Sequence, residues 1–514
     1  MTVASLRFDA QGFDAHGLGA QGIPRRHAVV VGPKAFVALT IAATAVVGVA
    51  AGTSPKAGAG LTAALAAGLI VLRRPVLGGI VLAGVVPAVS GLRRGLPVPG
   101  LRLSEALIAG IAVILLATVA RRQRAPWCAF DWAALGYVAV AALIGTYDLL
   151  RRSQGFDSTS VGTLAGPLEF FLLYRAAVVS LQTERSRRAA LRAVLFASVP
   201  VSLLALLQRS GVLGVPGILR TLTGVDLSTD YSYAQLHRAT GPFPHWQMLG
   251  AYLLVVILIA VALLLDRNQA VLRHRWLVGV LILDAAALLE TVSMSPLLAA
   301  IAGSIALSIW YGRGRQILVW LALAAAIGAV AFGSLLSARY DLQYARTPGQ
   351  TTNAIVPNTL AYRYEVWTKQ YLPALSGRWV TGWGPCCSTP TDLPSGLGWD
   401  FTESVYLTLL LRGGIILLAV YGLLMWGFGA LARSASRAGA GPPGDRAVGR
   451  VLLVLVLALI PLQFVEPYFV DTGLPHLLWA MAGLLTAARA GHLHARRSHA
   501  GEPYASEAYR EATV

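Results

Sequence analysis

Long, uninterrupted runs of apolar residues constrain this chain more than any other feature of its sequence. Residues 251–265 read AYLLVVILIAVALLL and contain no charged side chain. Runs of this kind extend over roughly 16 to 25 residues, the length that a helix needs to cross a hydrocarbon core. Because such segments are apolar all round, they lack the polar face of a helix in a soluble protein. We therefore predict an all-α polytopic membrane protein.

Composition and run length together predict about 12 to 14 transmembrane helices. Of the 514 residues, 56% are hydrophobic and only 13% are charged, which argues against a soluble fold. The apolar runs begin near Ala35, Ala57, Pro75, Leu103, Phe130, Val161, Ala189, Trp246, Trp276, Pro296, Gln316, Glu403, Val451 and Leu474.

The distribution of arginine predicts which loops face the cytoplasm. Basic residues are concentrated in alternate loops, such as 121–124 and 267–275, and cytoplasmic loops carry the excess of basic residues. Both chain ends are then cytoplasmic, and the two longest outer loops are residues 208–245 and 336–402. The net charge of +18 is explained by this role in orienting helices, so nucleic-acid binding is not predicted.

These assignments divide the chain into seven predicted segments. They are a cytoplasmic tail (1–34), an N-terminal transmembrane bundle (35–207), a first extracytoplasmic loop (208–245), central transmembrane helices (246–335), a long extracytoplasmic loop (336–402), C-terminal transmembrane helices (403–488) and a cytoplasmic tail (489–514). The three cysteines, Cys128, Cys386 and Cys387, are too few for a disulfide framework and match no metal-binding spacing. Adjacent Cys386 and Cys387 could form a strained vicinal disulfide, but two thiols are the favoured interpretation.

The long outer loop contains a predicted amphipathic helix from Asn358 to Leu375. Pro357 precedes it, and helical spacing places Arg363 and Trp367 on one face, as in a helix lying on a membrane surface. The residues after it are rich in proline and glycine as far as Gly398, and such a stretch can fold over a cavity at membrane depth.

Several short motifs between residues 238 and 414 occur in a set order at the outer ends of the apolar runs. They are RATGPF (238–243), TVSMS (291–295), RYEVW (363–367), GWG (382–384), ESVYL (403–407) and RGG (412–414). In this order the chain resembles the O-antigen ligase and O-antigen polymerase superfamily of bacterial surface-polysaccharide enzymes. It departs from that pattern at Met294, where the family often has arginine, and at Glu403-Ser404, where the family often has His-Asn.

The resemblance implies a membrane glycosyltransferase of polysaccharide biosynthesis in the cell envelope. Its donor would be a glycan on undecaprenyl diphosphate, its acceptor a glycan or a lipid, and its other partners the membrane lipids. The family resemblance also implies an inverting, metal-independent reaction without a cofactor, on the extracytoplasmic face of the bacterial inner membrane. Whether the chain ligates or polymerises stays open, because the two reactions share the donor and differ in the acceptor.

A diphosphate leaving group needs cationic neighbours, and the planar arginine fork binds two phosphate oxygens at once. Arg238 and Arg363 are the first candidates for this diphosphate site, with Arg175 and Arg412 as auxiliary contacts. The alternative for each is a side chain that reaches to lipid headgroups at the interface.

Five charged residues lie within apolar runs, and each costs about 2.5 to 3.5 kcal/mol at the bilayer centre. We therefore expect them to face the bundle interior or a wet cavity. They are Glu169, Arg175, Asp284, Glu290 and Arg412.

Glycosyl transfer also requires a group that takes the proton of the acceptor hydroxyl. Glu403, His245 and Glu365 are the candidates for this base. The alternatives are a helix-start carboxylate for Glu403, an interfacial anchor for His245, and a surface ion pair with Arg363 or Lys369 for Glu365. For sugar binding, the candidates are Trp367, Trp383 and Tyr406.

A flippase or exporter of lipid-linked oligosaccharide is the alternative function, since it would move the same substrate without chemistry. A transporter of this kind is expected to show paired, interrupted helices in two halves. The polar residues here are instead concentrated in two outer loops of the C-terminal half, which favours an enzyme over a transporter or an accessory scaffold.

Overall fold

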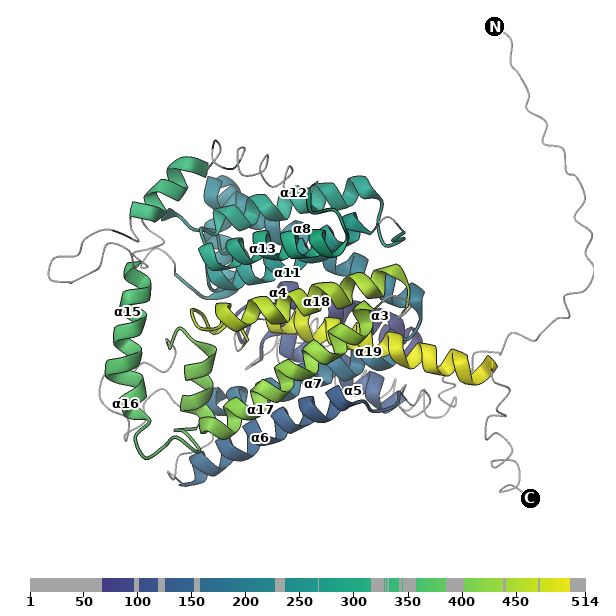
Figure 1. The fold of residues 1–514 in the computed structure, drawn as a ribbon, viewed down its shortest axis with the longest axis horizontal. Coiled ribbons are helices and arrows are strands. Elements are labelled where there is room, and N and C mark those ends of the chain that lie inside the picture. Colours follow the sequence, from purple (N-terminus) through teal and green to yellow (C-terminus); the bar gives the residue numbers. More distant parts are fainter. Residues whose placement is uncertain are drawn as a thin grey trace, which may run out of the picture. The chain divides into compact units, whose positions relative to one another are not determined.

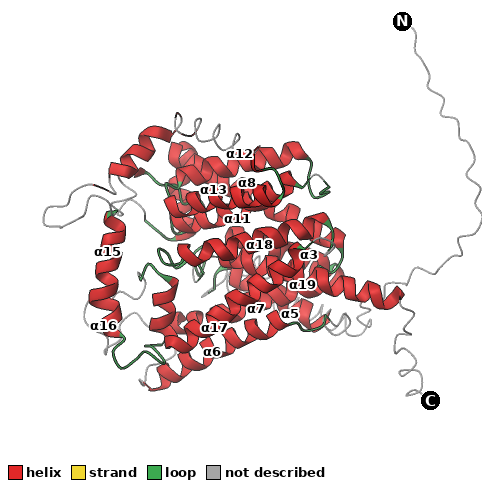
Figure 2. Cartoon of the chain, viewed as in Figure 1, coloured by secondary structure: helices red, strands yellow, loops and turns green. Residues whose placement is uncertain are grey.

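The computed structural model consists of helices joined by loops, and it contains no β-strand among the residues that it describes (Figures 1 and 2). The described residues are 67–96, 101–118, 125–151, 158–226, 236–266, 268–315, 328, 330, 332–341, 344, 357–384, 402–437, 441–469 and 472–499. The chain divides into two units, Met1–Gly58 and Ala59–Val514, and every described residue belongs to the second.

The longer helices begin close to the predicted starts of the apolar runs. They are α5 (Leu103–Thr118), α6 (Ala129–Arg151), α7 (Ser158–Ser180), α8 (Glu184–Ser210), α11 (Trp246–Leu265), α12 (His274–Glu290), α13 (Met294–Trp310), α17 (Val405–Ser436), α18 (Pro443–Leu462) and α19 (Leu474–His499). Shorter pieces are α3 (Pro75–Ile80), η1 (Val81–Val85), α4 (Val86–Val89), η2 (Val212–Gly214), α9 (Val215–Thr223), α15 (Asn358–Val366), η4 (Trp367–Tyr371) and α16 (Leu372–Ala374).

The prediction of an all-α polytopic membrane protein is confirmed. Within the described ranges, five helices are long and apolar enough to cross a membrane, or six if the bent pair Ala67–Arg73 and Pro75–Val89 is one span. Two further helices, α5 and α13, are apolar but shorter, with 16 and 17 residues. The total of 12 to 14 spans stays a prediction, since the runs near Ala35 and Gln316 lie outside the described residues.

Helix α11 shows why a segment can be apolar all round. It packs against α12, α13 and α18, and 89% of its most apolar window is buried inside the protein. Neighbouring helices therefore surround α11, whereas lipid would surround a helix at the periphery of the bundle. Since both environments are apolar, only the fold distinguishes a central span from a peripheral one.

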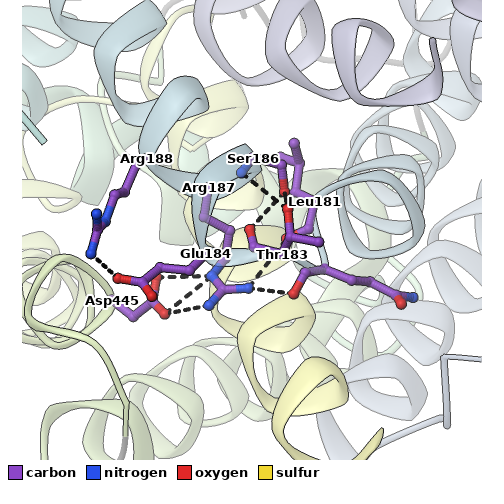
Figure 3. A network of polar contacts seen from close by, with 8 residues as sticks. Leu181, Thr183, Glu184, Ser186, Arg187, Arg188 and Asp445 are labelled. Atoms are coloured by element: carbon purple, nitrogen blue, oxygen red, sulfur yellow. Dashed lines mark hydrogen bonds and ion pairs between the residues drawn. The ribbon is translucent and has the colours of Figure 1, made fainter. Parts of the chain in front are cut away.

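One end of the helical bundle is fixed by a buried ion pair between the first turns of α8 and α18 (Figure 3). Arg187 Nε lies 2.9 Å from Asp445 Oδ1, and its Nη2 lies 2.8 Å from Oδ2. The remaining guanidinium nitrogen, Nη1, donates to the carbonyl of Gln182 at 2.6 Å. Both side chains are buried, so this end, which we call the Arg187 end, is held by a paired and hydrogen-bonded charge.

At the other end, which we call the motif end, α8, α12 and α18 finish and α11, α13, α17 and α19 begin. Three hydrogen bonds tie these termini together: Ala239 N to Glu290 O at 3.0 Å, Ser295 Oγ with Tyr468 Oη at 2.7 Å, and Val405 N to Gln463 O at 2.9 Å. The antiparallel course of consecutive helices thus brings motifs that lie far apart in the sequence to one end of the bundle.

Two features of the predicted outer loops refine the organisation expected from the sequence. The amphipathic helix is present as the continuous series α15, η4 and α16, with one π-helical turn in its middle. The first predicted loop contains a short helix, α9, which the sequence reading treated as loop.

Helix α17 changes direction at Gly413 and Gly414, which leave the helical region of backbone conformation. Gly414 has φ 62°, and a Cβ atom there would lie 2.1 Å from the carbonyl oxygen of Val380. Only glycine allows this close approach of the two backbones. The break separates the first two turns of α17, up to Arg412, from the rest of the helix.

Candidate active site

Three residues in or directly before the sequence motifs share an unusual backbone conformation. His237, Val292 and Glu403 have φ values of 46°, 49° and 51°, and they are the only non-glycine residues with left-handed backbone among those described. This conformation brings Cβ close to the following carbonyl and is most costly for a β-branched residue such as Val292. Strain of this kind collects at functional sites, where the surrounding structure maintains it. All three residues lie at the motif end.

The loop before α11 holds Arg238 in a buried position. Its side chain is 3% exposed, and its guanidinium lies 4.6 Å from the ring centroid of Trp246. The loop is fixed from the end of α8, because Gln208 Oε1 accepts from the backbone N–H groups of Thr240 and Gly241, both at 2.9 Å. The face of the Trp246 ring attracts this cation, and the contact fixes the position of the guanidinium.

A small apolar cluster joins this loop to the turn between α12 and α13. Leu236, Val292 and Leu335 are buried together, with Met294 packed against them. Arg339, one helical turn after Leu335, lies close enough to Arg363 for the two charges to interact. Burial, with the neighbouring Arg363 guanidinium as the second cause, lowers the pKa of Arg339 to about 10, so it stays cationic at neutral pH.

Arg363 and Glu403, predicted separately as a phosphate ligand and a base, form an ion pair in the structure. The Arg363 side chain is 12% exposed and the Glu403 side chain 32%, so the carboxylate faces the more open side. A second contact joins the same elements, because Trp367 Nε1 donates to the carbonyl of Thr402 at 2.9 Å. We call Arg238, Arg339, Arg363 and Glu403 the arginine cluster.

The other two candidate bases have different surroundings. His245 caps α11, since its Nδ1 accepts from the backbone N–H of Gln247 at 3.4 Å, and its ring lies 3.9 Å from that of Trp246. This places it beside Arg238 but engages its Nδ1 in the cap. Glu365 forms an exposed pair with Lys369 at 2.7 Å on α15, one of the two alternatives considered for it. The fold thus brings His245 to the Arg238 loop but does not bring Glu365 into the cluster.

The three aromatic candidates are packed in different ways. Trp383 is buried, its Nε1 donates to the carbonyl of Ala374 at 2.8 Å, and Arg378 lies over its ring. Tyr406 donates to the carbonyl of Ile460 at 2.8 Å. Trp367 is half-buried beside the Arg363–Glu403 pair and is the best placed of the three to contact a sugar.

The two auxiliary candidates for the diphosphate site, Arg175 and Arg412, lie at opposite ends of the bundle. Arg175 is bound by Asp131 at 2.6 Å near the start of α6, which is the Arg187 end of the bundle, and its guanidinium covers the ring of Trp127. The fold therefore does not bring Arg175 to the arginine cluster. Arg412 lies at the motif end, at the break in α17, and lines a cavity together with Glu169. Asp284 accepts from Ser198 and Ser202 inside the bundle, as expected for a charged residue within an apolar run.

Sequence reasoning missed two features of the motif end. Arg339 belongs to no motif, and its only signal was a cation in the long outer loop. Glu169 and His476 lie 307 positions apart, yet Glu169 Oε1 is 3.3 Å from His476 Nε2. No pattern along the chain indicates such a pair, although Glu169 was conspicuous as a carboxylate within an apolar run.

Comparison with known families confirms the resemblance on which these assignments rest. Residues 277–422 match the family model described as O-antigen ligase. The matched stretch runs from α12 across the predicted long outer loop into α17, and it contains Val292, Arg339, Arg363 and Glu403. A search of curated proteins found no match. The C-terminal half of this multi-pass membrane protein therefore contains an O-antigen ligase family region, and that region supplies most of the arginine cluster.

Proposed function

We propose that this protein is a membrane glycosyltransferase that ligates or polymerises undecaprenyl-diphosphate-linked glycan on the extracytoplasmic face of the bacterial inner membrane. The observation that carries the proposal is the arginine cluster at the motif end of the bundle. It combines Arg238 from the loop before α11, Arg339, Arg363 from α15 and Glu403 just before α17. The family match and the strained backbone at His237, Val292 and Glu403 support it.

In the proposed reaction, Arg238, Arg339 and Arg363 bind the donor diphosphate. Their fixed positive charge stabilises the negative charge that develops on the leaving group, a task that a metal ion performs in other enzymes. The oxygen of the acceptor hydroxyl attacks the anomeric carbon, and its proton passes to the Glu403 carboxylate. The bond between the anomeric carbon and the phosphate oxygen breaks, its electron pair stays on the undecaprenyl diphosphate, and the anomeric configuration inverts.

The ion pair between Arg363 and Glu403 gives this reaction an order of events. Without substrate, the guanidinium of Arg363 is bound by the Glu403 carboxylate. A diphosphate that binds Arg363 competes with that carboxylate and releases it to accept a proton. Donor binding would then prepare the base, so that Glu403 is free only when a leaving group is in place.

The experiment that tests the proposal uses purified protein in proteoliposomes with a lipid-linked glycan donor and a matching acceptor. The wild type should form a larger glycan. Glu403→Gln keeps the size of the side chain but removes its basicity, so turnover should fall about 10²- to 10⁴-fold while donor binding persists. Glu365→Gln, on α15 two residues after Arg363 and paired there with the exposed Lys369, is the matched control and should keep full activity.

Two outcomes would count against the proposal. Full activity of Glu403→Gln would transfer the role of base to His245, which lies beside Arg238. A wild type that forms no new glycosidic bond, yet moves labelled lipid between the two leaflets, would establish the flippase alternative.

A further inference from the structure

The motif end contains a polar cavity that the proposed reaction does not use. It has a volume of about 290 Å³ and lies among α5, α6, α7, α17 and the start of α19. The residues before α5 connect it to the motif end, since Gly91 packs against the backbone of Phe243 in the Arg238 loop. We call it the α7 cavity. The first two turns of α17 separate Arg412, at this cavity, from the residues next to Glu403 by roughly 10 Å of helix.

The charges that line the α7 cavity favour an anion. The lining contains three arginines, two glutamates and the imidazole of His476. The charged residues are Arg94, Arg102, Arg412, Glu105 and Glu169. Both glutamates have cationic or hydrogen-bonding partners within the lining, because Arg94 Nη2 lies 2.7 Å from Glu105 and Glu169 lies 3.3 Å from His476. The lining therefore has an excess of positive charge within an apolar helical bundle, where an electrostatic attraction is stronger than in water.

The imidazole of His476 provides a second, independent indication of a ligand. The residue is 3% exposed, and its Nε2 faces the Glu169 carboxylate. Its other ring nitrogen, Nδ1, is buried and has no hydrogen-bond partner among the described protein groups. The ring is held edge-on by Phe170, with the two ring centroids 5.0 Å apart. Buried polar atoms are nearly always hydrogen-bonded, so a ligand with oxygen or hydroxyl groups would complete this one.

Arg412 is held in place by the loop that follows the amphipathic helix. Trp383 N donates to the carbonyl of Leu411 at 2.6 Å, and Ile415 N donates to the carbonyl of Trp379 at 2.8 Å, on either side of Arg412. The break at Gly413 and Gly414 allows this loop to pack against α17. The backbone on both sides of Arg412 is therefore fixed at the cavity. The first turns of α17 connect Arg412 to Glu403, which lies two residues before this helix.

We propose that the α7 cavity binds the phosphate-bearing headgroup of the second lipid substrate, the acceptor of the transfer reaction. The proposal rests on the proposed function, since it assigns an acceptor to that reaction. Arg102 and Arg412 face the phosphate oxygens, and His476, as an imidazolium between Glu169 and the bound anion, donates from Nδ1 to an adjacent phosphate oxygen. Donor and acceptor diphosphates then occupy two basic sites joined by the first turns of α17. The acceptor hydroxyl is thereby directed toward Glu403.

Binding stoichiometry tests this inference without catalysis. Purified protein in phosphatidylcholine nanodiscs is titrated with farnesyl diphosphate, and native mass spectrometry counts the bound molecules. The wild type should bind two. Arg412→Gln and His476→Gln should each weaken one binding event by about tenfold or more, since a charge-assisted hydrogen bond to phosphate is lost. Arg363→Gln should weaken the other event, and Arg433→Gln, at the opposite end of the same helix, should keep both.

The binding data distinguish a failure of the cavity inference from a failure of the proposed function. If Arg412→Gln and His476→Gln both keep two bound molecules, the α7 cavity is not the second site and the inference is overturned, whereas the arginine cluster is unaffected. If these variants lose one molecule but Arg363→Gln loses none, the cavity stands and the proposed function fails. Equal displacement of the probe from the cavity by phosphatidylglycerol would overturn the acceptor assignment, because the cavity would then be a site for ordinary membrane lipid.

Discussion

Two arginine–carboxylate pairs, at opposite ends of the bundle, differ in how deeply they are buried and in how many of their hydrogen bonds are made. The Arg187–Asp445 pair has side-chain exposures of 4% and 10%, bidentate geometry and an additional backbone carbonyl on the guanidinium. The Arg363–Glu403 pair has exposures of 12% and 32%, and Glu403 adopts a left-handed backbone conformation. The first pair lies on regular first turns of two helices, whereas the second joins α15 to the strained turn at Glu403.

Under the proposed function, this difference distinguishes a structural ion pair from one that takes part in the reaction. A charge buried with all its hydrogen bonds made holds two helices together and has nothing left to offer a ligand. A pair that is partly open, at a strained position and next to further arginines, can exchange its carboxylate for a phosphate. The following predictions test whether the two ends differ in this way.

The largest expected effect concerns the membrane face of each end. After replacement of the native cysteines by serine, Ser376→Cys at the motif end should react with a membrane-impermeant thiol reagent on intact spheroplasts. Arg437→Cys, just after the other end of α17, should react only after permeabilisation. Both residues are exposed, so accessibility reports the side of the membrane. Reversed labelling would place the arginine cluster in the cytoplasm and refute the proposed topology.

Next in size is the loss of the Arg187 pair. Arg187→Ala leaves Asp445 as a buried charge without its cation, which should destabilise the protein by about 3 to 5 kcal/mol. Thermal unfolding in detergent and membrane abundance measure this effect. The double variant Arg187→Met with Asp445→Leu removes both charges and should recover most of the stability. A single variant that remains as stable as the wild type would contradict a structural role.

Arginine-to-lysine changes in the cluster should do the opposite, reducing activity while leaving stability nearly intact. Lysine keeps the charge of Arg238 or Arg363 but loses the planar fork that binds two phosphate oxygens. Glycan transfer should fall by about 10²-fold for each variant, with unchanged melting temperature. Arg433→Lys, exposed near the other end of α17, is the control. Equal transfer by all three variants would remove the diphosphate clamp from the proposal.

The smallest effect concerns backbone strain at His237. Its side chain is exposed and its φ is 46°, so His237→Gly should be more stable than His237→Ala by about 1 kcal/mol. At Arg433, inside a helix, the order should reverse by a similar amount, because glycine is the poorer helix former there. Melting temperatures of the four variants measure both differences. The same order at both positions would argue against strain at the motif end.

Several features followed from local sequence and were predictable. Helices begin at Pro75, Leu103, Trp246 and Leu474, as the apolar runs indicated, because hydrocarbon thickness imposes a minimum length on each run. The amphipathic helix after Pro357 was likewise predictable, since proline and the spacing of polar residues are local signals. Arg238, Arg363 and Glu403 could be selected from motifs because their order along the chain is itself a signal.

Other features depended on the tertiary structure, because they arise from residues that are distant in sequence. Arg175 appeared equivalent to Arg412, yet packing paired the first with Asp131 and placed the second at a cavity. No local pattern specifies that Glu169 meets His476, or that Arg339 lies close enough to Arg363 for their charges to interact. The sequence by itself determined which segments are helical and which motif residues are candidates for the site, since these depend on length, composition and spacing. The packing of antiparallel helices decided which charges meet, because the partner of a buried charge is chosen by proximity in the folded bundle.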